Sequence, residues 1–205
     1  MSSPSDVSFI SPQRITALTG GVFAIAMTLL VFDVKDVVVE ASHYTNLFPL
    51  LLPKLGSYLL GFIILGLLWN GHHIALHYTE RTDRMHLWLN ILFLIWAALV
   101  PFPAELLGER YDDPLSVLVY GVNLSLAVLS LYAVWKYATH QRRLVASDLP
   151  ERTVRALKVR LLSAVGFYAV AVGVAFIHSA AGIAVFVFSH LYFVVRPVTR
   201  AEAAN

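Results

Sequence analysis

The chain has 205 residues, of which 58% are hydrophobic and only 14% are charged, and its formal net charge is +2. A soluble domain averages about 25% charged residues, so this composition is that of a membrane protein. The absence of cysteine excludes disulfides, thiolate metal sites and cysteine nucleophiles. The net charge is small and no basic face carries aromatic residues, which argues against a nucleic-acid partner.

The first uncharged run extends over residues 15–32. At ~1.5 Å rise per residue, a helix of this length spans most of a ~30 Å hydrocarbon core. Ser11-Pro12 ahead of the run is typical of a helix N-terminus. One stripe of this helix combines a small residue, a hydroxyl and bulky apolar groups at three- and four-residue steps: Gly21, Ile25, Thr28, Leu29 and Phe32. Periodicity alone does not decide whether this stripe faces a neighbouring helix or a pore.

Further apolar segments follow, and they predict an all-α membrane protein with six transmembrane helices in a single domain over residues 1–205. We expect Pro101-Phe102-Pro103 to stop the third helix, and the polar, basic residues 136–160 to form a linker. One straight helix over the apolar residues 161–195 would be roughly 50 Å long, so a turn is predicted at residues 178–182. The predicted spans are residues 14–35, 50–79, 85–104, 114–137, 156–177 and 180–196.

Lysine and arginine are distributed unequally between the two ends of the predicted spans. With the N-terminus inside, all but three of the 15 fall on the inner side, and Lys35, Lys54 and Arg110 remain outside. Because cytoplasmic loops are enriched in positive charge, both termini are predicted to be cytoplasmic. The polar N-terminal segment has no basic region or small-residue cleavage site, so the first span itself is expected to direct insertion.

The second span carries several histidines close to its predicted inner end. Trp69, His73 and His77 lie four residues apart on one helix face, which lets the two imidazoles approach a common point. A metal site needs further ligands, and no acid or thiol stands at a matching spacing, so no metal is predicted. The favoured interpretation is a hydrogen-bonded polar cluster near the inner boundary of the membrane.

The sequence carries no pattern of catalytic residues. The serines within the spans lack a nucleophile elbow, and there is no zinc-protease helix motif, phosphate loop or dinucleotide-binding glycine pattern. We therefore predict neither an enzyme nor a cofactor. The glycine-tyrosine filter of classical potassium channels is also absent, so conduction would need another device, such as rings of apolar side chains that dewet a pore.

The start of the first predicted helix has a distinctive order of residues. Arg14 precedes Leu18-Thr19-Gly20, and residues 21–30 read Gly-Val-Phe-Ala-Ile-Ala-Met-Thr-Leu-Leu. This segment resembles the first helix of the transmembrane protein 175 family in its bacterial branch. There an arginine, three residues and a Phe-Ser-Asp triplet precede a nearly identical run, so Gly20 stands where the family has its aspartate.

Two later segments resemble motifs of the same family, one in its second helix and one in its third. Trp69 is followed by two histidines, and Asn90 is followed by Pro101-Phe102-Pro103. In the family these groups brace the first helix on the cytoplasmic half. Without the aspartate at Gly20, the brace would need other partners, such as a threonine or a histidine. Carried over to this chain, the resemblance implies a structural polar brace of Arg14, Thr19, Trp69, His73 and Asn90.

The resemblance also implies the assembly and the activity. It implies a homotetramer in the bacterial plasma membrane, with the first helix lining a central pore, because one stripe cannot enclose a pore by itself. The expected activity is passive conduction of potassium in preference to other cations, with K⁺ as the permeant ion. Ile25, near the predicted midplane, is expected to form the tightest ring. Leu29 and Phe32 would add apolar layers, and Thr28 would offer a hydroxyl to a partly dehydrated ion.

Two other functions are compatible with a chain of this kind. A secondary transporter or proton-coupled cation exchanger predicts an ionisable group at the midplane and inverted repeats with broken helices. The centres of the predicted spans carry no acid, and the sequence shows no internal repeat. A membrane scaffold without transport is also compatible with the sequence.

Overall fold

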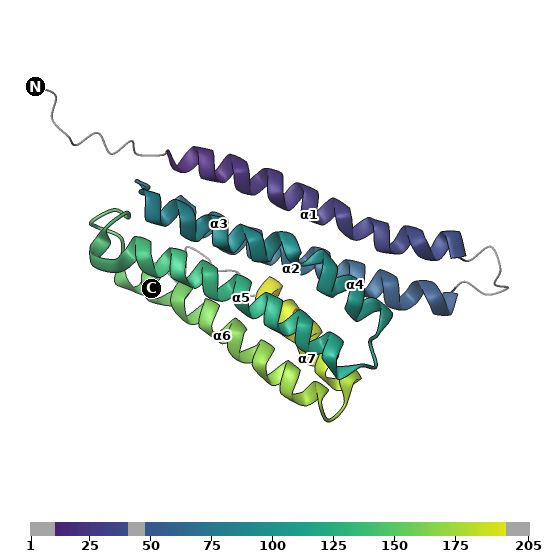
Figure 1. Cartoon of the computed structure of the whole chain (residues 1–205). Coiled ribbons are helices and arrows are strands. Elements are labelled where there is room, and N and C mark those ends of the chain that lie inside the picture. Colours follow the sequence, from purple (N-terminus) through teal and green to yellow (C-terminus); the bar gives the residue numbers. More distant parts are fainter. Residues whose placement is uncertain (1–10, 41–47, 196–205) are drawn as a thin grey trace, which may run out of the picture.

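A computed structural model describes residues 11–40 and 48–195, and every regular element in this part of the chain is a helix. Figure 1 shows long helices that lie alongside one another and alternate in direction. A polar backbone in lipid has to satisfy its own hydrogen bonds, which a helix does within one segment. The helices are α1 (Pro12–Glu40), α2 (Phe48–His77), α3 (Arg84–Leu99), α4 (Pro101–Glu109), α5 (Pro114–Thr139), the short 3₁₀ helix η2 (His140–Arg142), α6 (Glu151–Ala175) and α7 (Ser179–Val195).

Helices α1, α2, α5 and α6 are each long and apolar enough to cross a bilayer, and α3 and α4 together form one further span. Among the described residues five candidate spans reach this length, and α7, with 17 residues, is shorter but equally apolar. The chain is therefore a multi-pass membrane protein. The alternating directions place the start of α1 and the end of α7 toward the same end of the bundle (Figure 1), while the side of the membrane on which that end lies stays a prediction. The five spans are Pro12–Phe32, Leu51–His77, Arg84–Glu109, Pro114–Arg142 and Glu151–Ala175.

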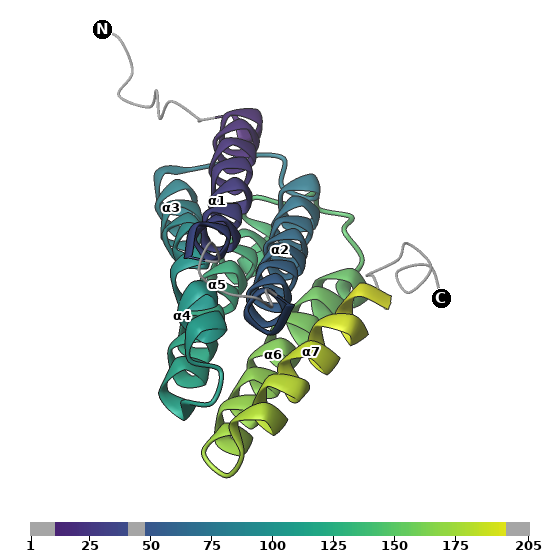
Figure 2. The same ribbon diagram turned by 90° about the vertical axis from the view of Figure 1, so that its right-hand side faces the viewer.

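Helix α5 forms the centre of the bundle. It packs against α3 on one side and α6 on the other, and its Tyr120, Leu124 and Trp135 are completely buried. The indole Nε1–H of Trp135 donates to the backbone oxygen of Val154, which pairs the one polar atom of that side chain. Figure 2 shows α1 at the edge of the bundle, away from α6 and α7. Helix α1 therefore buries only the face that meets α2, α3 and α4.

The third span differs from the predicted one at its prolines. Helix α3 does end before Pro101, at Leu99, but Pro101 then begins α4, which continues to Glu109. The expectation that the helix stops at this segment was therefore only half right. A proline at the first position of a helix lacks an N–H that would be unpaired there anyway, so the chain can restart a helix at once. Figure 1 shows α4 extending α3 in the same direction.

The predicted linker, residues 136–160, is largely helical and packed. Helix α5 runs to Thr139, α6 starts at Glu151, and the connection between them lies against the α2–α3 loop. Leu144 accepts hydrogen bonds from the backbone N–H groups of Glu80 and Arg81, at N–O distances of 2.9 and 3.3 Å. The segment therefore does not link separate parts of the chain as predicted, because apolar side chains in it, Leu144 among them, are buried.

Asp83 joins the same two loops through its side chain. Its carboxylate accepts hydrogen bonds from the His86 backbone N–H at 2.8 Å, the Tyr137 hydroxyl at 2.8 Å and the Arg143 Nε at 3.2 Å. Partial burial raises the pKa of Asp83, but these donors and the Arg143 charge outweigh it, so the pKa lies below its ordinary value. The carboxylate thus also caps the N-terminus of α3.

A turn does interrupt the last apolar segment, but it lies at residues 176–178 and not over the predicted residues 178–182. Helix α6 ends at Ala175 and α7 begins at Ser179, and the His178 backbone oxygen accepts from the N–H groups of Ala181 and Gly182. A Cβ on Gly182 would lie 2.5 Å from the Ala175 Cβ and 2.7 Å from the Ala171 backbone oxygen. Glycine at this position therefore permits α6 and α7 to pack closely just after the turn.

Candidate functional site

One face of α1 is packed into the chain. Ile15, Thr19, Phe23, Ala26 and Leu30 are buried, at the three- and four-residue spacing of a single helical stripe. The Phe23 ring lies 6.0 Å, centroid to centroid, from the ring of Phe93 on α3. These contacts fix the rotation of α1 about its axis, and so they also fix which residues it presents to the outside.

The side of α1 away from this packed stripe is apolar and open. All four residues predicted to line a pore lie on it: Ile25 is 62% exposed, Leu29 46% and Phe32 55%, and Thr28 is exposed as well. The Thr28 hydroxyl donates to the Ile25 backbone oxygen at 2.8 Å, which leaves the lone pairs of its own oxygen unused by that bond. We call Ile25, Thr28, Leu29 and Phe32 the open stripe.

Two residues of the open stripe, Leu29 and Phe32, border a small cavity of about 60 Å³ between α1, α2 and α4. A cavity of about 380 Å³ lies elsewhere, between α2, α4 and α7, and contains none of the four residues. The pore-lining role of the open stripe stays a prediction at this point.

Three of the five residues assigned to the brace lie on α2 and α3, and the structure places them at two separate positions. Asn90 is buried on α3, and its Oδ1 lies 2.7 Å from Nε2 of His72 on α2. The Asn90 Nδ2 donates to the His86 backbone oxygen at 2.7 Å. Trp69 and His73, by contrast, are exposed and stack on each other with ring centroids 5.4 Å apart. The structure therefore joins Asn90 to His72 and His86, and leaves His73 on another face of α2.

The remaining two members of the predicted brace lie on α1. Thr19 is buried within the chain, and its hydroxyl has no hydrogen-bond partner. Arg14 lies on the exposed side, eleven residues before Ile25 and hence about three turns away in line with the open stripe. Gly20 is exposed, and a Cβ there would meet nothing within 4 Å. An aspartate at that position would therefore point away from the packing of its own chain.

Sequence reasoning missed His72, because the hydrophobic pattern of α2 does not mark its buried side. The buried residues of α2 recur at helical spacing, with Leu65, Leu68, Ala75 and Leu76 on the same side as His72. The opposite stripe of α2 is nearly as apolar, so hydrophobicity alone does not distinguish the buried side. Within the described residues no group of three or more histidine, aspartate or glutamate side chains is arranged to hold a metal ion.

The comparison with known proteins agrees with the helix arrangement and with the position of the motifs. A family model described as endosomal/lysosomal potassium channel TMEM175 matches residues 14–101, which include α1 and α3. A potassium channel of Streptomyces collinus is 32% identical over 201 residues, covering 93% of this chain and 96% of the relative. The chain belongs to the TMEM175 family.

Two further matches come from Chamaesiphon minutus. One is a protein named as a potassium channel, 32% identical over 190 residues, covering 89% of this chain and 93% of the relative. The other is the crystal structure of a TMEM175 homolog described as a lysosomal potassium-selective channel. It aligns with a TM-score of 0.78 and 28% identity over 92% of this chain and 98% of that one. The TMEM175 family is one of ion channels, and the chain is not an enzyme.

Proposed function

We propose that the protein is a potassium-preferring cation channel of the bacterial plasma membrane, built from four copies around a pore lined by α1. The main support is the similarity, over nearly the whole chain, to bacterial relatives that are named potassium channels. The open stripe is compatible with the proposal. A membrane helix that leaves a line of large apolar side chains uncovered needs a neighbour for it, whether lipid, another chain or a pore.

In the proposed assembly each residue of the open stripe repeats four times around the axis. Ile25 forms the narrowest ring, and Leu29 and Phe32 form wider apolar layers toward the end of α1. Apolar rings narrow a pore and resist its wetting, so the resting conductance depends on their size and polarity. Thr28 places a hydroxyl oxygen between these layers, where it can replace part of the water around a potassium ion. Conduction is passive and needs no cofactor.

Arg14 and Gly20 belong to the contact between subunits in this proposal. Both lie on exposed parts of α1, so neither is held by the packing of its own chain. The polar brace of the resemblance, in which Arg14, Trp69 and His73 take part, then forms across the subunit boundary. Inside each chain the bond between His72 and Asn90 keeps α2 and α3 in register behind α1.

The decisive experiment measures ion flux from proteoliposomes that contain the purified protein, under K⁺ or Na⁺ gradients. We expect passive flux that is larger for K⁺, and a changed rate or K⁺/Na⁺ ratio in Ile25→Asn, because an amide in the narrowest ring favours wetting. Flux that requires a counter-gradient would favour an exchanger instead. The absence of any flux would favour a scaffold.

Val31→Asn is the matched control for this experiment. Val31 is 50% exposed on the same helix, but six residues after Ile25, which places it about 120° further round the axis. The same change of chemistry is therefore made on α1 at similar exposure, outside the open stripe. Equal effects of the two variants would show that Ile25 has no special position in the pathway.

A further inference from the structure

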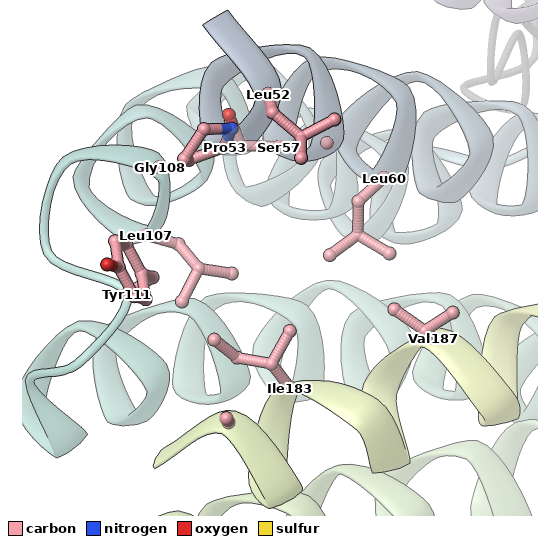
Figure 3. Close-up of a pocket in the computed structure, with 11 residues that line it drawn as sticks. Leu52, Pro53, Ser57, Leu60, Leu107, Gly108, Tyr111, Ile183 and Val187 are labelled. Carbon is pink, nitrogen blue, oxygen red and sulfur yellow. The ribbon is translucent and has the colours of Figure 1, made fainter. Parts of the chain in front are cut away.

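A second feature of the chain is an apolar cavity that no residue of the open stripe lines. It has a volume of about 380 Å³ and lies where α2 begins, α4 ends and α7 begins. Figure 3 shows the side chains of Leu60, Leu107, Ile183 and Val187 directed into the same space from these three helices. The lining is almost entirely apolar. This volume falls in the range of pockets that bind small ligands.

The position of the cavity along the helices corresponds to a definite depth in the membrane. Its lining on α2 starts at Leu52, next to Leu51, the first residue of the candidate span Leu51–His77, and continues to Leu60. Eight residues along a helix correspond to about 12 Å. The cavity therefore starts at the level where a span meets the lipid headgroups and extends inward into the hydrocarbon layer.

An ion pair lies at the headgroup end of the cavity. Pro53 and Gly108 line the cavity, and the residues that follow them in the chain, Lys54 and Glu109, approach each other to 3.3 Å between Nζ and Oε1. The Lys54 side chain is only 16% exposed, whereas that of Glu109 is 50% exposed. One positive and one negative group thus stand side by side where the apolar walls end.

These features together favour a phospholipid as the occupant. A protein segment would bring backbone N–H and C=O groups into an apolar space that offers almost no hydrogen-bond partner, which is costly. An acyl chain has no polar atoms and surrounds every membrane helix. The ion pair is complementary to a headgroup with both charges, since a phosphate can approach Lys54 while an ammonium approaches Glu109. An anionic headgroup has no ammonium, so its negative charge and the Glu109 carboxylate would share the single positive charge of Lys54.

We propose that the cavity holds one acyl chain of a zwitterionic phospholipid of the phosphatidylethanolamine type, with its headgroup at the Lys54–Glu109 pair. The site is separate from the open stripe and does not depend on the proposed conduction. It gives the junction of α2, α4 and α7 a lipid that fills the space between them.

The test uses phosphatidylethanolamine with a photoreactive diazirine in one acyl chain, reconstituted into vesicles with the full-length protein. Illumination followed by peptide mass spectrometry locates the labelled residues. We expect labels on the cavity residues of α2, α4 and α7 in the wild type. Gly56→Leu should remove most of this labelling, because Gly56 lines the cavity and a Cβ there meets nothing within 4 Å, so the new side chain can fill the space.

Gly66→Leu is the matched control for the filled cavity. It makes the same substitution on the same helix, at another glycine where a Cβ meets nothing within 4 Å, outside the cavity lining. We expect this variant to keep the wild-type labelling. Labelling spread evenly over lipid-facing residues, the absence of label from the cavity, or equal labelling of Gly56→Leu and wild type would each overturn the proposal. A cavity covered by a second copy of the chain would give the second of these results.

The headgroup assignment is tested with the same chemistry. Lys54→Met should lower the labelling of the cavity by about ten-fold, the lower end of what a hydrogen bond to a charged group contributes, while Lys54→Arg should keep it. A phosphatidylglycerol probe with the same acyl chains should label the cavity less than the phosphatidylethanolamine probe. Equal labelling by the two lipids would show that the ion pair does not select the headgroup and would overturn that part of the proposal.

Discussion

His72 and Asn90 hold α2 and α3 together through one buried hydrogen bond, with Nε2 and Oδ1 2.7 Å apart. The direction of this bond follows from the other end of the amide. Asn90 Nδ2 faces the His86 backbone oxygen at 2.7 Å, and a carbonyl oxygen only accepts hydrogen bonds, so Oδ1 must face His72. The proton therefore sits on Nε2 of His72. The His72 ring also stacks on Phe93, at a centroid distance of 4.9 Å, which places it directly behind the Phe23 contact of α1.

Loss of this bond should destabilise the protein more than loss of the neighbouring histidine. Asn90→Ala leaves the Nε2–H of His72 without its partner in the interior, and we expect a cost of about 1–2 kcal/mol. Thermal unfolding in detergent measures the effect as a lower Tm. His73→Ala removes an exposed side chain and should change the Tm little. A larger loss for His73→Ala than for Asn90→Ala would contradict the assignment of the buried partner.

The stability contributed by Asp83 should depend on pH. Its folded-state pKa is lowered, so the ionised form stabilises the fold fully above the unfolded pKa of about 3.9, and this contribution disappears as the pH falls through the folded value. Asp83→Asn should therefore lower the Tm at pH 7, and the difference from wild type should shrink as the medium becomes acidic. Asp148→Asn, at an exposed position, serves as the control. A Tm difference between Asp83→Asn and wild type that grows toward low pH would contradict this mechanism.

The close packing after the turn should make Gly182 sensitive to one added methyl group. Gly182→Ala places a Cβ against Ala175 and against the Ala171 backbone, which cannot move away as a side-chain tip can. We expect a destabilisation of about 1–3 kcal/mol from the overpacking. Gly173→Ala on α6 meets nothing within 4 Å and should instead be neutral or stabilising by up to about 1 kcal/mol, because alanine is the better helix former. Similar melting temperatures for both variants would contradict the close approach.

The absence of cysteine from the sequence makes the proposed assembly directly testable by cross-linking. In a ring of four chains, Ile25→Cys brings equivalent sulfur atoms toward one another at the narrowest point, and an oxidant should produce disulfide-linked dimers on a denaturing gel. Leu162→Cys, exposed on α6, is the control and should remain monomeric. Efficient cross-linking at residue 162 but not at residue 25 would place a different helix at the centre.

Several features of the fold could be predicted because they depend on local chemistry. A long run without charges in lipid has to be helical, since no other segment satisfies its own backbone hydrogen bonds. The length of residues 161–195 against the thickness of a bilayer required the turn that the structure has between α6 and α7. The open stripe of α1 was also identifiable, because Ile25, Leu29 and Phe32 follow the helical repeat and the motif around them is almost complete.

The sequence alone determined that the chain spans a membrane with helices and that α1 carries the family motif. The tertiary structure decided which side of each helix is inside, because a span that is apolar all round has no marker for its buried face. His72 and His73 are adjacent in the sequence but about 100° apart around α2, and only the packing of α3 makes His72 the partner of Asn90. The same holds for Pro101, which ends one helix and begins the next because the packing of α4 on α2 and α5 stabilises its continuation.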